Sequence, residues 1–561
     1  MNKLSAAGRL WRDAPTVSLK EPRRFIRLLL EQRGLVDDTS REIYLAPSLS
    51  HIPDPALMAD MDIAVKRIIS AIKSQEHITV YGDYDVDGVS SATILVSFLR
   101  KLGAKADFYI PDRRTEGYGL NLAAVEHIAT QSPLMITVDC GITSVAEVAR
   151  ANELGCNVII VDHHQVPDPM PAAIACLNPH RPDCRYPFKP LCAAGVAFML
   201  AIALRRTLRE QGYFTVYKEP DVRELLDVVA LATVADMVPL EGINRILVHA
   251  GLQRMTTHPR AGIYALMKVA GIDPEQIKAS HLGFQLGPRI NARGRLEHAG
   301  QAVELLLSDD KYLSEHIAQM LDHANRERRR IESETVEIAM KRIQEEGTWK
   351  KTSGLVLYDP TWHPGILGLV ASRVMQKYHR PTIVIGEGGK GSGRSIPGVD
   401  LHHAMHAGSA LLEKFGGHKA AAGLTIIEEN IDAFRACFQQ DVIEQIGEPP
   451  YTPEMIPDLT VNTSELNLGV IEHLRQMEPF GHHNPAPLFV AHHVPIKEMR
   501  IVGEKHLKLR LGNEKHDAIM FNQAPLMQTL GSHADIVFGI EENHYRGNTT
   551  LQLRVEDVRT A

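Results

Sequence analysis

The sequence lacks the features that mark secreted and membrane proteins. Its six cysteines form no C-x-x-C pair in 561 residues, as is typical of a chain kept reduced in the cytosol. The longest uncharged apolar stretch, residues 191–204, is shorter than the roughly 20 residues of a membrane span and predicts a buried helix. The first residues contain no apolar signal-peptide segment. We therefore expect a cytoplasmic protein without a membrane-spanning segment.

An excess of positive charge is also absent. The formal net charge is −7, which counts mildly against a nucleic-acid binder because such proteins are often basic. The apolar content of 44% and the charged content of 23% are ordinary for a soluble globular protein. A chain of this length is too long for one hydrophobic core and indicates about three domains.

Between residues 78 and 162, continuous apolar runs alternate with amphipathic stretches. Apolar runs separated by helices predict βαβ units and a parallel sheet with both faces covered. In such sheets, ligands gather at the carboxyl ends of the strands. The four runs are residues 78–81, 108–110, 135–138 and 158–161.

The patterns of apolar and charged residues divide the rest of the chain into a connecting helix and two further domains. A charged stretch without proline or glycine, residues 309–346, predicts a long helix of the kind that joins domains. An α/β pattern restarts after it, and short alternating runs near the C-terminus predict a small all-β barrel or sandwich. The expected parts are a first domain with an N-terminal extension (1–308), a connecting helix (309–347), a smaller α/β domain (348–449) and an all-β domain (450–561).

Carboxylates follow the first predicted strand at every second position, in the stretch DYDVDG. Asp83, Asp85 and Asp87 would repel one another in a dry environment unless loop amides or divalent cations compensated them. Oxygen ligands with one or two imidazoles suit Mn²⁺ or Mg²⁺ better than a structural zinc. A simpler interpretation is that these residues only cap a turn and the following helix, because Asp and Gly are common in turns.

Other predicted strands are also followed by carboxylate or imidazole side chains. Asp139 follows one apolar run in MITVDCG, and Asp162, His163 and His164 follow another in VIIVDHH. Asp236 follows an apolar stretch in LATVADMVPL. Because the carboxyl ends of parallel strands meet at one edge of a sheet, turn capping alone no longer accounts for the pattern. A shared divalent-metal site is the better explanation.

Ten motifs, in order along the chain, carry a resemblance to a known family. DYDVDG, VDCG, VDHH and VADMVPL resemble the DHH phosphoesterase superfamily. EGYGLN, LGPRINARGRLEHA, WHPGILGLVASR, GSGRS, GGHKAAAG and EPFGHHNPAP resemble, more narrowly, the bacterial RecJ single-strand-specific exonucleases. The resemblance implies a parallel-sheet DHH domain, joined by a long helix to a smaller α/β DHHA1-type domain and followed by a C-terminal all-β OB-fold.

The resemblance also implies a set of metal ligands and catalytic residues. Asp139 is the expected bridge between two ions, Mn²⁺ or Mg²⁺, whereas the choice of the two directly binding aspartates in DYDVDG stays open. Asp162 is expected to orient the pair and His164 to face the phosphate. The implied metal ligands are Asp83, Asp85, Asp87, Asp139, His163 and Asp236, and the implied catalytic residues are Asp162, His164, His363 and His418.

A further set of residues is expected to hold the phosphates of the substrate. The guanidinium of arginine can donate two parallel hydrogen bonds to a terminal phosphate. Glycines near the start of a helix leave backbone amides free to bind anions. Taken alone, these residues fit ordinary turns and surface positions better, and the resemblance to the family is what favours phosphate contact. The implied phosphate- and DNA-binding residues are Arg113, Tyr118, Arg289, Asn291, Arg373, Ser392 and Arg394, with Tyr118 a candidate to stack on a base.

The resemblance implies a metal-dependent, single-strand-specific 5′ to 3′ DNA exonuclease that releases mononucleotides by a two-metal mechanism in recombination and repair. Its expected partners are single-stranded DNA, a single-strand-binding protein and a helicase, and the expected state is a monomer. A metal site in a cleft between the two α/β domains would admit a single strand and exclude a duplex. Two alternatives are a DHH-family phosphatase or phosphodiesterase on small phosphate substrates, and a catalytically dead DNA-binding scaffold. The length disfavours the first, and the filled acid positions disfavour the second.

Overall fold

The computed structural model describes residues 4–112, 116–117, 119–296, 300–347, 349–545 and 548–560. The chain forms two compact units and passes between them four times, after residues 21, 325, 468 and 486. The sheet unit comprises Pro22–Asn325 and Gly469–Ala486. The barrel unit comprises Met1–Glu21, Arg326–Leu468 and Pro487–Ala561.

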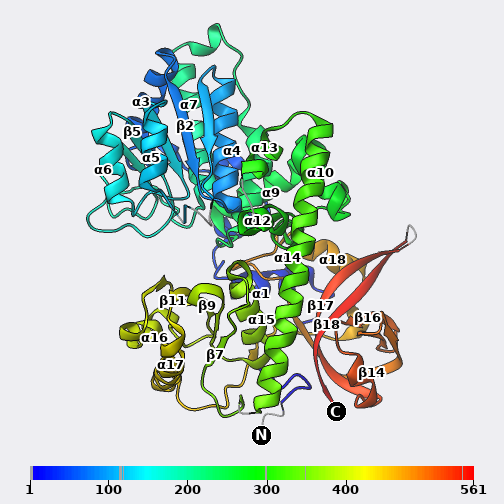
Figure 1. Ribbon diagram of the computed structural model, residues 1–561. Helices are drawn as coiled ribbons and strands as arrows, with labels where there is room; N and C mark the ends of the chain where they lie inside the picture. The colour runs from blue at the N-terminus through cyan, green and yellow to red at the C-terminus, as the bar shows by residue number, and fades with distance from the viewer. Residues whose placement is uncertain are drawn as a thin grey trace. The chain divides into compact units, whose positions relative to one another are not determined.

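A five-stranded, all-parallel sheet forms the centre of the sheet unit (Figure 1). The strand order is β3-β2-β4-β5-β6, so the order reverses between β2 and β4. Ligand sites of open α/β sheets lie beyond the carboxyl ends of the strands at such a switch point. The parallel sheet that the apolar runs predicted is confirmed. Its strands are β2 (His77–Gly82), β3 (Lys105–Tyr109), β4 (Leu134–Val138), β5 (Asn157–Val161) and β6 (Ala175–Leu177).

Helices cover both faces of this sheet. Side chains such as Met135 and Ile160 pack against α5 and α6 on one face, and Val80 and Ile136 pack against α3, α4 and α7 on the other. Because both faces are buried, the strands are apolar throughout instead of alternating. The helices are α3 (Met61–Lys73), α4 (Val86–Lys101), α5 (Leu122–Ala129), α6 (Val145–Glu153) and α7 (Ala193–Glu210), the last containing most of the long apolar stretch.

The remainder of the sheet unit is helical. Its elements are α1 (Pro22–Gln32), α2 (Asp38–Leu45), α8 (Leu226–Ala235), α9 (Gly242–Thr257), α10 (Ala261–Ala270), α11 (Ala279–His281), α12 (Gly287–Leu296), α13 (Gly300–Leu307) and most of α18 (Leu468–Arg475). The long helix α14 (Lys311–Glu346) continues from this unit into the barrel unit, as its uninterrupted charged sequence suggests.

The first half of the barrel unit is a mixed sheet between two helical layers. Strands β7 and β8 are parallel, and the other neighbours in the order β10-β11-β9-β8-β7 are antiparallel. Helix α15 and the end of α14 pack on one face, and α16 and α17 on the other. The elements are β7 (Leu355–Tyr358), α15 (Leu367–Tyr378), β8 (Thr382–Ile385), β9 (Lys390–Arg394), α16 (Leu401–Ala407), β10 (Lys414–Gly417), β11 (Ala421–Thr425) and α17 (Ile431–Ile446).

The second half is a closed five-stranded barrel with a long β17–β18 hairpin (red in Figure 1). Pairing of β14 with β17 closes the ring, which confirms the expected all-β domain. The strands are β14 (Phe489–Val502), β15 (His506–Leu511), β16 (His516–Met520), β17 (His533–Tyr545) and β18 (Asn548–Thr560), with β13 (Leu459–Thr460) added beside β14 and a separate pair of β1 (Leu10–Trp11) with β12 (Glu454–Met455). Among the helices described, none combines the length and apolarity needed to cross a bilayer.

Candidate active site

The carboxyl ends of β2, β4 and β5 bring the predicted metal ligands together. His163 Nε2 lies 3.3 Å from Asp139 Oδ1 and 3.7 Å from Asp236 Oδ2. It also lies 3.7 Å from Asp87 Oδ2. Three overlapping triplets have ligand atoms within 4.8 Å of one another: Asp139, His163 and His164; Asp87, His163 and Asp236; Asp83, Asp85 and Asp139. The six predicted metal ligands thus form one group, here called the acid cluster: Asp83, Asp85, Asp87, Asp139, His163 and Asp236.

Backbone amides fix two aspartates of the turn after β2. Asp85 caps α4, and its Oδ1 accepts hydrogen bonds from the amides of Asp87 (2.9 Å) and Gly88 (3.2 Å). The buried carboxylate of Asp87 accepts from the amides of Ala193 (2.7 Å) and Ala194 (2.9 Å), at the start of α7. The positive end of a helix stabilises a carboxylate there. Asp85 therefore both caps a helix and belongs to the acid cluster, and no sequence pattern predicted the contact of Asp87 with α7.

Asp139 adopts an uncommon backbone conformation at the end of β4. Its φ angle of +59° lies in the left-handed region, which residues other than glycine rarely occupy. Its amide donates to the carbonyl of Val161, at 3.0 Å, and its Oδ1 lies 4.0 Å from His164 Nδ1. Backbone strain of this kind persists only where the surroundings enforce it, and it clusters at functional sites.

Asp162 is completely buried and organises the loop after β5. Its Oδ1 accepts from the amides of His163 (2.7 Å) and His164 (3.1 Å) and pairs with His164 Nδ1 (2.7 Å), and its Oδ2 accepts from the Ile142 amide (3.1 Å). Burial alone would raise the pKa of Asp162, but the hydrogen bond and charge of His164 outweigh it and the pKa is lowered. Burial likewise opposes protonation of His164, yet Asp162 raises its pKa above the ordinary value. The two side chains form a fixed hydrogen-bonded pair.

The electrostatics of the acid cluster fit a divalent cation. Burial is the largest cause that raises the pKa of Asp87, Asp139 and Asp236, and repulsion from Asp85 adds to it. Burial also lowers the pKa of His163, which favours the neutral imidazole with a free lone pair. Within the part of the chain that the structure describes, the buried Asp236 Oδ2 has no hydrogen-bond partner. Carboxylates and an imidazole that lack their own compensation are suitable ligands for Mn²⁺ or Mg²⁺.

In the barrel unit, Ser392 and Arg394 lie on β9 beside the start of α15. Arg394 Nη1 donates to Ser392 Oγ (3.3 Å) and to the Gly393 carbonyl (2.7 Å). A Cβ atom on Gly368 would lie 2.8 Å from Arg394 Nη2 and 3.0 Å from Ser392 Oγ, so glycine at this position lets both polar atoms approach the start of α15. Burial lowers the pKa of Arg394, and no carboxylate pairs with it among the residues described. A half-buried guanidinium without an anionic partner is suited to a phosphate.

Three more predicted residues lie on the same unit. His363 Nδ1 accepts from the Gly365 amide at 3.0 Å, which leaves the proton of the neutral ring on Nε2. His418 is exposed in the turn between β10 and β11. Arg373 is exposed on α15, with its Nε 3.5 Å from Glu332 Oε1. All three side chains therefore reach solvent or keep a donor free, as substrate contact requires.

Arg289 and Asn291 lie on α12 in the sheet unit. Arg289 is 8% exposed, and it donates from Nε to Asp322 Oδ1 (2.9 Å) and from Nη1 to the Gln285 carbonyl (2.7 Å). It thereby ties α12 to α14. The buried Asn291 Oδ1 has no hydrogen-bond partner in the described ranges. Two other predicted DNA-binding residues fall outside the described residues: Arg113 and Tyr118.

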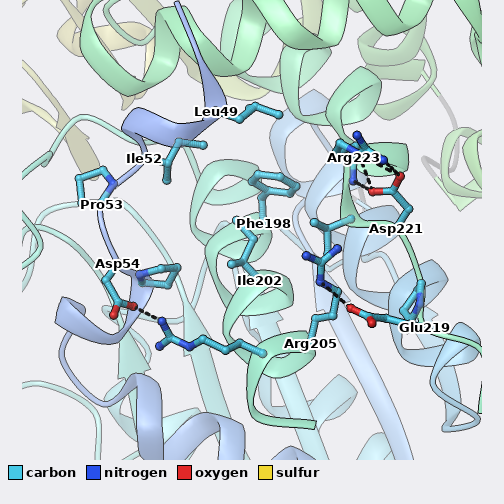
Figure 2. A pocket seen from close by; sticks show the side chains of 14 residues that line it. Leu49, Ile52, Pro53, Asp54, Phe198, Ile202, Arg205, Glu219, Asp221 and Arg223 are labelled. Atoms are coloured by element: carbon cyan, nitrogen blue, oxygen red, sulfur yellow. Dashed lines mark hydrogen bonds and ion pairs between the residues drawn. The ribbon is translucent and has the colours of Figure 1, made fainter. Parts of the chain in front are cut away.

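A pocket of about 840 Å³ lies at the other end of α7 and contains none of the predicted site residues (Figure 2). At ~1.5 Å per helical residue, Arg205 in its lining is about 18 Å along α7 from Ala193. Phe198 and Ile202 contribute apolar surface. Each arginine of the lining is paired with a carboxylate: Arg205 with Glu219, Arg206 with Asp54, and Arg223 with Asp221. The charges are neutralised within the pocket, so it offers no counter-ion to a charged ligand.

Comparisons with known proteins agree with this arrangement. Family models match residues 77–233 (DHH family, N-terminal domain), 351–444 (DHHA1 domain) and 457–557 (RecJ OB domain). The chain is 38% identical over 555 residues to the single-stranded-DNA-specific exonuclease RecJ of Dickeya dadantii, covering 95% of each chain. It is 38% identical over 524 residues to that of Escherichia coli, covering 89% of this chain and 90% of the relative.

Solved structures extend the similarity to the whole fold. RecJ of Thermus thermophilus in complex with Mn²⁺ matches with a TM-score of 0.83 and 30% identity, covering 98% of this chain and 79% of the other. The same protein in complex with Mg²⁺ matches with a TM-score of 0.76 and 28% identity, covering 98% and 78%. The resemblance stated from the motifs and the expected three-part fold are confirmed. The chain belongs to the RecJ family of single-stranded-DNA-specific exonucleases, with DHH, DHHA1 and OB domains.

Proposed function

We propose that this chain is a divalent-cation-dependent exonuclease of the cytosol that degrades single-stranded DNA from the 5′ end to mononucleotides, in recombination and repair. The convergence of Asp139, His163 and Asp236 carries the proposal, because these residues come from three separate segments and their ligand atoms meet. The relatives are named for single-stranded DNA as their substrate, and solved relatives hold Mn²⁺ or Mg²⁺.

We propose two ions in the acid cluster. The three ligand triplets overlap at Asp139 and His163, so neighbouring sites can share these two residues. Asp83 and Asp85 would belong to one site, and Asp87 and Asp236 to the other, with Asp139 as the bridge. A bound pair of divalent cations lowers the pKa of the attacking water and neutralises charge on the phosphoryl oxygens.

The residues around the acid cluster hold and orient the reacting groups. Asp162 fixes the backbone of the loop and the ring of His164, and thereby fixes the position of His163. Asp162 raises the pKa of His164, which favours a ring that donates a proton to a phosphoryl oxygen of the scissile group. A preorganised positive charge at this point stabilises the charge that develops as the bond breaks.

In the barrel unit, we assign phosphate binding to Arg394 and Ser392, whose polar atoms lie close to Gly368 at the start of α15. His363 offers its Nε2 proton and His418 its exposed ring to phosphate oxygens. DNA contact by Arg113, Tyr118, Arg289, Asn291 and Arg373 stays a prediction. We further propose that the protein acts as a monomer with a helicase and a single-strand-binding protein, which supply and present single strands.

The test compares 5′-labelled single-stranded DNA, a blunt duplex and inorganic pyrophosphate, each with Mn²⁺, with Mg²⁺ and with EDTA. Only the single strand should be degraded, only with metal, and labelled mononucleotides should appear first. Asp139→Ala should abolish cleavage, whereas Asp273→Asn, an exposed helix cap in the same unit, should not. Cleavage in EDTA would refute the metal mechanism. Hydrolysis of pyrophosphate would favour a small-substrate phosphatase, and DNA binding without cleavage would favour a scaffold.

A further inference from the structure

Residues 476–484, here called the strap, lie far along the chain from the acid cluster but pack within the same unit. They contain most of the motif EPFGHHNPAP, for which the proposed mechanism has no use. The strap lies against the loop 236–241, which joins α8 to α9 and begins with Asp236 of the acid cluster.

Three contacts join the strap to this loop. The Leu240 amide donates to the His482 carbonyl at 2.9 Å, and His483 Nδ1 lies 3.4 Å from Glu241 Oε1. A Cβ atom on Gly481 would lie 2.6 Å from Leu240 Cδ1 and 3.3 Å from its Cγ. Leu240 is buried and has little room to turn away. The backbone of Gly481 is therefore in close contact with the loop.

Among the residues described, the hydrogen bonds between this loop and its flanking helices lie near its two ends. The Asp236 amide still donates to the Ala232 carbonyl of α8, at 2.9 Å. Met237 then adopts a φ angle of +60°, in the left-handed region. At the other end, Asn244 Nδ2 of α9 donates to the Pro239 carbonyl at 3.0 Å. Directly after Pro239, the strap supplies the partner of the Leu240 amide, the carbonyl of His482.

The strap is itself held by a fully satisfied side chain. Asn484 is buried, and its Oδ1 accepts from the Tyr44 hydroxyl (2.8 Å) and from Arg33 Nε (3.1 Å). Its Nδ2 donates to the carbonyls of Met477 (3.0 Å) and Pro479 (2.9 Å). Both lone pairs and both protons of the amide are thus used, which fixes one conformation of the turn.

A buried arginine of α9 connects this helix to the strap. Arg245 is 2% exposed, and its guanidinium lies over the Tyr44 ring, 3.8 Å from the centroid. It donates to the carbonyls of Tyr44 (3.0 Å), Met477 (2.9 Å) and Gln476 (3.1 Å). Because α9 begins directly after the loop 236–241, Arg245 fixes the strap relative to the same helix that ends the loop.

We infer that the strap is a positioning segment for Asp236, with Gly481 and Asn484 as its positioning residues. It sets the place of the Asp236 carboxylate beside His163 and thereby the affinity of the cation site to which both belong. This inference rests on the proposed function, in which Asp236 is a metal ligand. Residues that hold metal ligands in place commonly contribute ~10–100-fold to metal affinity.

The test uses Gly481→Ala in the full chain. Its new methyl group requires Leu240 Cδ1 to move by roughly 1 Å to reach an ordinary carbon–carbon contact, which displaces the loop. Mn²⁺ binding is measured by electron paramagnetic resonance of the free ion, without substrate. One binding step should weaken by about tenfold or more while the other is retained. Leu240→Ala, added to Gly481→Ala, should restore most of the lost affinity because it removes the clashing atoms.

Gly531→Ala is the matched control, because its Cβ would meet no atom within 4 Å. Unchanged Mn²⁺ binding in Gly481→Ala overturns the inference, and so does a loss that the second substitution does not restore. If Gly481→Ala does not fold, recovery of folding and of Mn²⁺ binding in the double variant supports the contact, and failure to recover contradicts it. A wild-type chain that binds no Mn²⁺ would instead overturn the proposed function.

Discussion

Asp162→Asn is the sharpest test of how the loop after β5 is held, because it preserves shape and removes only charge and one acceptor. The most favourable orientation keeps the amide oxygen at the Oδ1 position, where three donors converge. The new amide nitrogen then faces the backbone N–H of Ile142, so two donors oppose each other in a fully buried place. The substitution cannot satisfy both sides of the original carboxylate.

The expected cost follows from these contacts. A buried donor left without an acceptor costs roughly 1–3 kcal/mol. The hydrogen bonds that remain lose their charge assistance, which is about half of their strength. Removal of a buried charge offsets part of this loss. Because Asp162 has a lowered pKa in spite of its burial, the charge is favourable on balance, and we expect a loss of about 2–4 kcal/mol in the free energy of unfolding.

The effect should also reach the acid cluster. The Asp162 side chain holds the amides of both His163 and His164, so their rings lose a fixed position. We expect Mn²⁺ affinity to fall by about 10–100-fold. Urea unfolding followed by circular dichroism measures the first effect, and Mn²⁺ titration the second. Asp273→Asn is the control, since it changes the same atoms at an exposed cap. An Asp162→Asn chain as stable and as competent in Mn²⁺ binding as this control would refute the reasoning.

Two further predictions follow from the acid cluster and from the arginine on β9. Mn²⁺ at ~100 times the Kd of the site that contains Asp236 should add about 2.7 kcal/mol to the free energy of unfolding through that site, because the ion binds the folded carboxylates. Asp236→Ala should remove this contribution in thermal unfolding, and an equal gain in the variant would contradict the assignment. Arg394→Lys should lower kcat/KM on single-stranded DNA by about tenfold, or ~1.4 kcal/mol, because a lysine cannot form the planar fork of a guanidinium. The control, Arg435→Lys at an exposed pair with Asp432, should leave kcat/KM unchanged. Equal rates in both variants would exclude phosphate binding by Arg394.

Local patterns predict much of this fold because its sheet is regular. Strands buried on both faces have apolar sequences, and three of them, β2, β4 and β5, are followed at once by an aspartate, as with Asp139 after β4. The long helix and the closed barrel also follow from patterns that span only a few residues at a time. The motifs then narrow a general α/β arrangement to one family.

Long-range contacts explain what the sequence does not reveal. The amides of Ala193 and Ala194 hold Asp87 across more than a hundred residues, and no periodicity marks alanine as a partner of a carboxylate. The left-handed φ angle of Asp139 depends on the sheet around it. The pairing of Arg289 with Asp322 is a further contact that depends on the packing of α12 on α14, and phosphate binding by this arginine stays a prediction.

The passage of residues 469–486 through the sheet unit has a practical consequence for dissecting the molecule. A gene shortened to end before residue 469 would still encode every carboxylate and imidazole of the acid cluster, yet it would omit the carbonyl of His482 that receives the Leu240 amide. We therefore expect such a shortened chain to lack a contact that holds the loop 236–241. To restore this contact, one would have to splice the late stretch directly onto the early one, or supply it as a separate peptide.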